Sequence, residues 1–329
     1  MIKQWTTPEI LDYSRSFQPA CVLAAAATLD VFSPLRAKPM TAGKLACELG
    51  TDLRATTILL DALVVLEFLS KKGEEYNVPE NVAGLLTEQS ADNVLPMIRH
   101  HANCLRRWAE LAKVTRTGKC AETGPGVRGA DADQADFIGA MNTISRPVAD
   151  EIINKIRPSR FHHMLDIGGG PGTWTIAFLR AAPEARATLF DLPAVVLIAK
   201  KNFAEAGLAD RVTLVEGDFY TDALPEGADL AWLGAICHQN SRQQNRDLFA
   251  NVHDALVDDG TLVIRDVIME PCHTSPVGGA LFAVNMLVGT EAGGTYTFDE
   301  YREDLCAAGF ARVELIHRDE LMNSLIHAD

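Results

Sequence analysis

From Phe161 onward, short continuous apolar runs alternate with segments in which apolar positions have helical spacing. Short apolar runs occur at "HHMLDIG", "ARATLFD", "RVTLVEGD", "ADLAWLGAICH" and "GTLVIRDVIM". Between them, "TWTIAFLRAAP", "PAVVLIAKKNFAEAG" and "SRQQNRDLFANVHDAL" have helical spacing. Strands that alternate with helices form a doubly wound parallel sheet with helices on both faces. The pattern therefore predicts an α/β domain over 161–329.

The end of the chain departs from this alternation. The segments "ARVELIHRD" and "ELMNSLIHA" are consecutive apolar strands, and the turn between them is too short for a crossover helix. Such strands pair antiparallel. We therefore expect a C-terminal antiparallel strand pair on an otherwise parallel sheet.

The first hundred residues have helical periodicity instead. Apolar positions recur every three or four residues through "ILDYSRSFQPACVLAAAATLDVF" and "LRATTILLDALVVLEFLSKKG". Between these runs, Thr41 is an expected N-cap and Gly50 an expected helix stop. The following "KKGEEYNVPE" predicts a strand-turn wing, so 1–105 is expected to form an all-α, winged-helix-like domain.

A winged helix raises the hypothesis of a ligand-sensing regulator that binds DNA. The candidate reading helix from Leu53 to Ser70 carries Arg54, Asp61 and Glu67 and is otherwise nearly all apolar. A reading helix needs a cationic, polar face toward the groove, whereas an apolar helix belongs in a core or subunit interface. The second interpretation is preferred.

A helical segment over 106–160 is expected to connect the two domains and to contribute to a substrate pocket. It is interrupted at 117–136, "TGKCAETGPGVRGADADQAD", which is rich in Gly, Ala and Asp and predicts a surface loop.

The charge balance and the cysteine pattern limit the classes of binding partner and the cellular compartment that we expect. The 30 Lys and Arg residues against 44 Asp and Glu give a formal charge of −14, which disfavours nucleic acid and anionic membranes. Seven cysteines without a CxxC pair suit reduced thiols, a cytoplasmic location and the absence of a metal. The run "ACVLAAAATLDVF" is about 13 residues long, too short for a span of about 20.

Glycines follow the first predicted strand in "LDIGGGPGTWT". Gly168, Gly170 and Gly172 form a GxGxG loop that lets backbone amides and the next helix N-terminus approach a ligand. A simple tight turn is the alternative. Thr173 stands where the dinucleotide fingerprint needs its third glycine, so a nicotinamide-dependent oxidoreductase is disfavoured but stays open.

Acidic residues follow the next two strands. Asp191 could accept the hydroxyls of a ribose, or it could simply begin a turn. Asp218 could bond an adenine amino group while Phe219 stacks on the ring. Because ligands bind outside the carboxyl ends of the strands, these residues and the glycine loop are expected to converge on one cleft.

In this order, "LAAAATLDVF", "TAGKLACELGTD", "DIGGGPG", "DLP", "GDFY", "ICH" and "LFAVNMLVGTEAGGTYTFDEYREDLCAAGF" resemble the S-adenosylmethionine-dependent O-methyltransferases of the winged-helix, dimeric type. The resemblance covers nearly the whole chain. It implies a Rossmann-like domain, an interlocked homodimer through the N-terminal helices, and no metal. The implied S-adenosylmethionine-binding residues are Asp166, Gly168, Gly170, Gly172, Asp191, Leu192, Asp218, Phe219 and Gly234.

His238, at the end of the fourth apolar run, is implied as general base. It would take a proton from an acceptor hydroxyl, and such assistance is typically worth ~10²–10⁴ in rate. An ordinary imidazole near pKa ~6.5 suits a phenol near ~10 far better than an alcohol near ~15.7. A phenol, an enol or another acidic hydroxyl is the expected acceptor, and Asp266 is expected to brace the imidazole.

Two departures accompany this base. Family members commonly have His-Asp-Trp where this chain has His238, Gln239 and Asn240, and "GGKERT" is replaced by "GGTYT". Methylation of sulfur or carbon, or other chemistry, therefore stays open. An apolar acceptor slot with one amide is expected from helices that cap the cleft, namely Trp108, Phe137, Met141, Phe282, Asn285 and Met286.

Overall fold

The computed structural model describes residues 3–88, 90, 92–156 and 161–329. Their contacts divide the chain into two compact units. The first contains the described residues of Met1–Arg106 and Gly124–Thr143, and the second contains those of Arg107–Thr123 and Ile144–Asp329. The segment 106–160 thus contributes to both units, and its role as a separate linker domain stays a prediction. Within the described ranges, no helix is long and apolar enough to cross a membrane.

The first unit is mainly helical. Thr41 caps a helix by accepting a hydrogen bond from the Lys44 amide, and Gly50 ends it in the left-handed conformation. A small antiparallel sheet of order β1-β3-β2 supplies the expected wing. The elements of this unit up to residue 86 are α1 (Thr7–Ser14), α2 (Phe17–Thr28), α3 (Phe32–Ala37), β1 (Met40–Thr41), α4 (Ala42–Leu49), α5 (Leu53–Val65), β2 (Ser70–Lys72), β3 (Glu75–Asn77) and α6 (Glu80–Leu86).

The segment after α6 is more helical than expected. It contains α7 (Leu95–Trp108), α8 (Leu111–Thr117), α9 (Ala130–Ser145) and α10 (Ala149–Ile156). The predicted loop over 117–136 is wrong at both ends, because Thr117 closes α8 and α9 begins at Ala130. Asp131 and Asp133, taken as loop residues, lie in the first turn of α9, where acidic side chains stabilise the positive end of the helix dipole.

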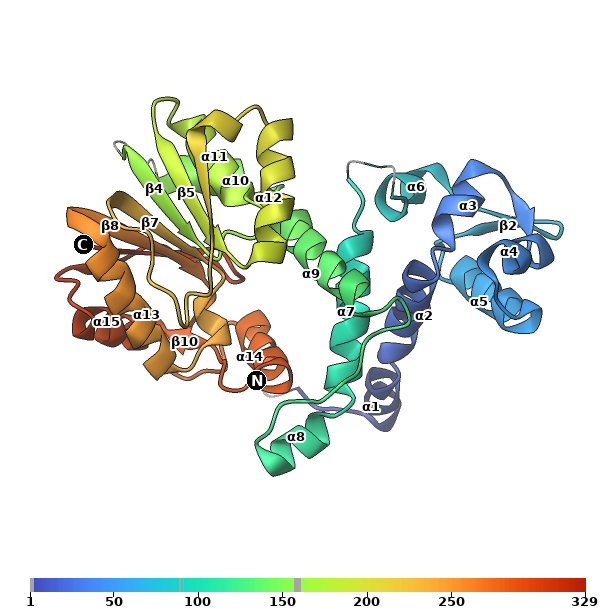
Figure 1. Ribbon diagram of the computed structural model, residues 1–329. Helices are drawn as coiled ribbons and strands as arrows, with labels where there is room; N and C mark the ends of the chain where they lie inside the picture. The colour runs from blue at the N-terminus through green and yellow to red at the C-terminus, as the bar shows by residue number, and fades with distance from the viewer. Residues whose placement is uncertain (1–2, 89, 91, 157–160) are drawn as a thin grey trace. The chain divides into compact units, whose positions relative to one another are not determined.

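The second unit is the doubly wound sheet that the alternation predicts. Seven strands have the order β11-β12-β8-β7-β4-β5-β6 (Figure 1). All pairs are parallel except those of β12 with β8 and with β11. The strands are β4 (His163–Ile167), β5 (Arg186–Asp191), β6 (Val212–Glu216), β7 (Ala228–Gly234), β8 (Leu256–Asp266), β11 (Val313–His317) and β12 (Ser324–Ala328). The expected C-terminal antiparallel pair is confirmed.

Helices cover both faces of this sheet. In β7, Ala231 and Leu233 pack in a core with α13 and α15, whereas Leu230 and Trp232 pack in one with α10 and α11. This two-residue alternation is why the strands are apolar throughout. The remaining elements are α11 (Thr173–Ala181), α12 (Pro193–Glu205), η1 (Ala209–Arg211), η2 (Cys237–Gln239), α13 (Arg242–Ala255), β9 (Ile268–Met269), α14 (Val277–Gly289), β10 (Tyr296–Thr297) and α15 (Phe298–Ala307).

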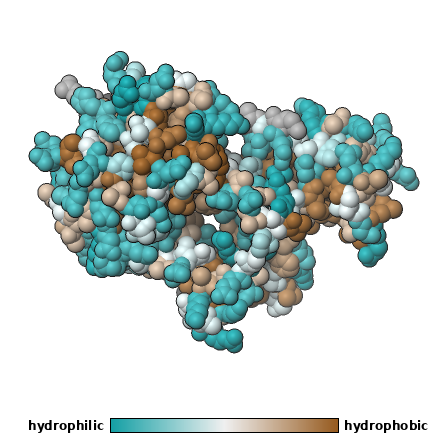
Figure 2. Space-filling view, in the orientation of Figure 1, coloured by the Kyte–Doolittle hydropathy of each residue, from teal (hydrophilic) through white to brown (hydrophobic). Residues whose placement is uncertain are grey.

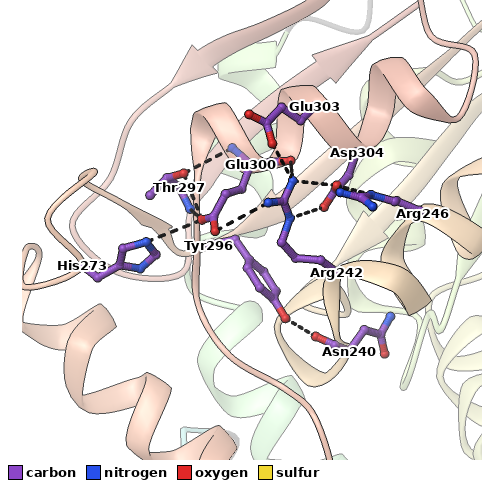
Figure 3. A network of polar contacts seen from close by, with 9 residues as sticks. All are labelled: Asn240, Arg242, Arg246, His273, Tyr296, Thr297, Glu300, Glu303 and Asp304. Carbon is purple, nitrogen blue, oxygen red and sulfur yellow. Dashed lines mark hydrogen bonds and ion pairs between the residues drawn. The ribbon is translucent and has the colours of Figure 1, made fainter.

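An ion-pair network joins α13 to α15 beside the sheet. Asp304, only 3% exposed, accepts hydrogen bonds from Arg242 and Arg246 at 2.6–2.9 Å (Figure 3). Thr297 and Glu300 form a capping box that starts α15 directly after β10. The network fixes the segment that carries Tyr296 against the loop that follows β7.

Candidate active site

The glycine loop after β4 has the conformation that only glycine adopts easily. Gly168, Gly170 and Gly172 have φ values of +66°, +57° and +80°. A Cβ on Gly172 would lie 2.5 Å from Phe203 Cζ, whereas a Cβ on Gly170 would meet nothing within 4 Å. Gly172 therefore allows the loop to pack on α12, and Gly170 is the glycine that faces open space.

The loop ends after β4, β6 and β7 converge at Gly168. A Cβ built there would lie 2.6 Å from Ile236 Cδ1 and 3.6 Å from Phe219 Cε1. Ile236 follows β7 and Phe219 follows β6. The structure thus brings the glycine loop and the loop that carries Phe219, which the sequence assigned to one cleft, together with the loop that leads to His238.

Asp191 ends β5 and lies against the same loop. Its Oδ2 accepts a hydrogen bond from the Gly170 amide at 2.7 Å, and its Oδ1 accepts one from Leu192 N at 2.7 Å. Burial raises the pKa of this carboxyl, and the two amide donors lower it in part. The side chain is partly exposed, so each carboxylate oxygen retains acceptor capacity for a ligand.

Asp166 lies behind the glycine loop rather than on its open side. It is 1% exposed and accepts a hydrogen bond from Thr175 Oγ1 at 2.5 Å. Burial raises its pKa to about 7, with the nearby Asp191 acting in the same direction. Its position supports the loop, and its direct contact with a ligand stays a prediction.

The loop after β6 is closed by its own side chains. Asp218 Oδ1 accepts from the Tyr220 amide at 3.0 Å, and the Asp218 amide donates to Asp222 Oδ2 at 2.8 Å. The rings of Phe219 and Tyr220 lie 4.5 Å apart. The turn thereby holds the partly buried Phe219 ring beside Gly168, as a stacking role would require.

The chain turns sharply after β7. A Cβ on Gly234 would lie 2.5 Å from Trp232 Nε1, and Ala235 has the left-handed φ of +62°. A non-glycine residue in this conformation is uncommon and is found preferentially at functional sites. This turn leads into η2, which carries His238.

His238 is bound to a fully buried carboxylate. Its Nδ1 lies 2.9 Å from Asp266 Oδ1, and its backbone N donates to Asp266 Oδ2 at 3.2 Å. Asp266 is 0% exposed and ends β8, the neighbour of β7. The ring also packs edge-on against Phe282 of α14, with centroids 4.8 Å apart. With Nδ1 as the donor to Asp266, Nε2 carries the lone pair of a base.

Two of the predicted acceptor-pocket residues bond to each other in the second unit. Trp108 Nε1 donates to Asn285 Oδ1 at 2.9 Å. Asn285 shares a face of α14 with Phe282 and with the buried Met286. Phe137 and Met141 belong to the first unit, and their part in an acceptor pocket stays a prediction.

The chain matches the sequence pattern of an O-methyltransferase domain over residues 124–311, which is more than half of its length. Residues 11–88 match an O-methyltransferase dimerisation domain.

The chain belongs to the O-methyltransferase family.

Individual relatives agree with this membership over most of their length. The tetracenomycin polyketide synthesis 8-O-methyl transferase TcmO of Streptomyces glaucescens is 30% identical, over 93% of this chain and 91% of that protein. The 3-hydroxy-5-methyl-1-naphthoate 3-O-methyltransferase of Streptomyces sahachiroi is 30% identical, over 89% and 86%. A crystal structure of human N-acetylserotonin methyltransferase with its methyl donor matches with a TM-score of 0.82 and 25% identity, over 100% and 99%.

The protein is therefore a methyltransferase with the expected fold and family. This result favours methyl transfer over the oxidoreductase and DNA-binding hypotheses. Tyr220, Tyr296 and Asn245, which the sequence did not single out as site residues, contact Asn240 beside His238. Two signals were available: Asn240, where the resemblance implies a tryptophan, and the "GGTYT" segment, which contains Tyr296.

Proposed function

We propose that this enzyme transfers the methyl group of S-adenosylmethionine to an acidic hydroxyl of a small, largely apolar aromatic or enolic molecule, with His238 as general base. The observation that carries the proposal is the 2.9 Å contact between His238 Nδ1 and the fully buried Asp266. A buried carboxylate on Nδ1 orients the ring and stabilises the imidazolium that forms when Nε2 takes a proton.

The loops at the ends of β4, β5 and β6 fit the methyl donor. Gly170 leaves open space where a nucleoside can approach the backbone, and Asp191 offers carboxylate oxygens suited to ribose hydroxyls. Phe219 offers a ring face for adenine, with Asp218 next to it as an acceptor for the adenine amino group. When bound, the sulfonium donor supplies an electrophilic methyl group. Leu192 and Gly234 complete the set of residues proposed to bind the methyl donor. Leu192 shapes the backbone beside Asp191, and Gly234 shapes the turn that leads to His238.

The acceptor would lie beside the base and against α14. Phe282 packs on the imidazole and supplies an apolar wall, while Trp108 holds Oδ1 of Asn285 and leaves its amide NH₂ as a donor. Such a wall with one amide suits a planar molecule that carries a hydroxyl and a second polar group. The names of two relatives specify O-methylation in polyketide synthesis and at a hydroxynaphthoate, which supports an aromatic hydroxyl here.

We also propose that the enzyme is a homodimer built through the dimerisation domain. None of the residues of α1 is buried, although it carries Ile10, Leu11 and Tyr13, and Phe17 of α2 is exposed as well. Figure 2 shows hydrophobic side chains on the surface around α2 and α5. Apolar surface of this kind is typical of subunit interfaces. Light scattering on the full chain tests the dimer.

We propose a cytoplasmic location as well, which accords with the seven cysteines because they form no CxxC pair or regular framework.

The decisive experiment supplies methyl-labelled S-adenosylmethionine with a mixed library of phenols, hydroxynaphthoates, enols and thiols. We expect label in an oxygen-methylated phenol or enol, and a decrease of about 10²–10⁴ in rate for His238→Ala. Calorimetry with S-adenosylhomocysteine, run in parallel, is expected to give comparable heats for the two proteins. Equal rates with and without the imidazole would remove His238 from the mechanism, and label only in thiols would overturn the hydroxyl acceptor.

A further inference from the structure

Asn240 lies two residues after His238 and is fully buried. A buried amide is costly unless its hydrogen-bonding groups are satisfied. Both ends of this side chain have partners: Tyr220 donates its hydroxyl to Oδ1 at 2.5 Å, and Nδ2 donates to Asn245 Oδ1 at 3.0 Å. This buried position two residues after the base is thus the centre of a polar network.

This network fixes the backbone on either side of His238. The Tyr296 hydroxyl donates to the carbonyl of Asn240, and Asn245 Nδ2 donates to the carbonyl of Cys237 at 3.0 Å (Figure 3 shows Tyr296 beside Asn240). The carbonyl of His238 itself accepts from the Gly294 amide at 2.9 Å. Tyr296 lies in the "GGTYT" segment, so the two segments at which the sequence departs from the pattern that the resemblance implies contact each other.

The other end of the network lies in the loop after β6. Tyr220 is adjacent to Phe219, and its amide is held by Asp218, both proposed adenine-binding residues. Although its side chain is half exposed, its hydroxyl reaches Asn240 in the interior. A change in this loop on ligand binding would therefore reach the turn that carries the base through the hydrogen bond between the Tyr220 and Asn240 side chains.

We infer that Tyr220, Asn240 and Tyr296 form a positioning device that couples the nucleoside-binding loop to His238, so that the imidazole takes its working orientation when the methyl donor is bound. The inference rests on the proposed function. None of the three is a catalytic residue: Tyr220 and Tyr296 act on Asn240, and Asn240 acts on the turn that carries the base.

Both tyrosines stay protonated donors in the working pH range. Burial raises the pKa of Tyr296 to about 12, and nearby Cys237, Glu300, Asp304 and Asp266 act in the same direction. Burial, with Asp218 and Cys237, also raises the pKa of Tyr220. Replacement by phenylalanine removes only the hydroxyl and keeps the ring, whereas substitution of the fully buried Asn240 itself risks misfolding.

The test follows the His238 imidazole by NMR in full-length protein with ¹³C-labelled histidine, with and without saturating S-adenosylhomocysteine. His238→Gln assigns the resonance, and calorimetry measures the affinity. In the wild type, we expect the ligand to shift the His238 signal. Tyr220→Phe and Tyr296→Phe are each expected to reduce this shift by at least half and to weaken binding about 3–10-fold, as loss of one hydrogen bond of about 1 kcal/mol implies. Tyr76→Phe, which removes a tyrosine hydroxyl that donates to Asp61 in the first unit, is the matched control and is expected to keep the wild-type shift and affinity.

The outcomes separate the two proposals. If Tyr220→Phe or Tyr296→Phe binds S-adenosylhomocysteine and shows the full wild-type shift, the coupling is wrong while the proposed function stands. If the wild type gives no heat with S-adenosylhomocysteine, the proposed function fails and the coupling fails with it. A loss of thermal stability without a change in the shift also overturns the coupling, because that result describes a purely structural contact.

Discussion

The imidazole of His238 contacts the carboxylate of Asp266, and this carboxylate is shielded from solvent. Nδ1 of the imidazole lies 2.9 Å from Oδ1 of Asp266, and the carboxylate also accepts from the backbone amides of His238 and Val267. Three donors therefore converge on one buried side chain. Asp266 ends β8, whereas His238 lies in η2, just after the turn that follows the neighbouring strand β7, so the sheet fixes the carboxylate and the turn places the imidazole against it.

Asp266→Asn should separate the charge of this carboxylate from its shape. The amide keeps one acceptor oxygen but loses the charge that stabilises the imidazolium, so we expect kcat to fall by at least about 10². Affinity for S-adenosylhomocysteine should stay within about 2-fold of wild type, which corresponds to less than 0.5 kcal/mol. Steady-state kinetics and calorimetry test both expectations. An unchanged kcat would remove Asp266 from the proton-transfer step.

Gly170 and Gly172 should differ when each is replaced by alanine. Both have positive φ, which costs an L-residue about 1–2 kcal/mol. Only Gly172 also meets a buried ring, at 2.5 Å from Phe203 Cζ, so Gly172→Ala should destabilise the protein by about 3 kcal/mol in urea unfolding. Gly170→Ala should keep most of the stability but lower affinity for S-adenosylhomocysteine at least 10-fold. Wild-type affinity in Gly170→Ala would show that this glycine does not line the ligand site.

The raised pKa of Asp166 predicts that the free energy of unfolding depends on pH. Burial raises its folded-state pKa to about 7 from an ordinary value of 3.8. Because the folded-state value is raised, the stabilising contribution is full below pH ~4 and is lost as the pH rises through 7. Between pH 5.5 and 8.5, this group alone should lower the free energy of unfolding by about 2 kcal/mol.

Asp166→Asn stays neutral throughout that range and should abolish this component in urea titrations at the two pH values. Asp258→Asn, at an exposed aspartate of β8, is the matched control and should retain the wild-type slope. If both variants keep that slope, Asp166 is already ionised in the folded protein and its environment is more polar than its burial implies.

The positions of the strands along the chain were predictable because both faces of the sheet are covered. Alternate residues of β7 enter different cores, so the run "LAWLGAIC" is apolar throughout, and the turn to polar residues marks its end at His238. The pairing of β11 with β12 followed from the short turn between them. The loop over 117–136 was mispredicted because its aspartates favour both turns and helix N-termini, and their composition does not distinguish the two.

The sequence predicted that the loops after the strands meet, but not which side chains of different loops contact each other. Tyr220 and Asn240 are 20 residues apart in loops after different strands, and no periodicity relates them. The direction of the Asp166 side chain was likewise beyond what the motif could predict. The motif places it beside the glycines, but the direction of its side chain depends on the pleat of β4, which turns it inward to Thr175.

Trp108 tests whether the amide of Asn285 orients the acceptor. The indole N–H holds Asn285 Oδ1 at 2.9 Å, so Trp108→Phe frees the amide to rotate while keeping an aromatic wall. Loss of one hydrogen bond of about 1 kcal/mol should raise the acceptor KM about 5-fold. Affinity for S-adenosylhomocysteine should not change, because Trp108 in α7 and Asn285 in α14 do not belong to the loops proposed for the nucleoside. Trp5→Phe, at an exposed tryptophan of the first unit, is the control. If Asn285→Ala raises KM but Trp108→Phe does not, Asn285 acts without the indole; if neither does, the amide is not part of the acceptor site.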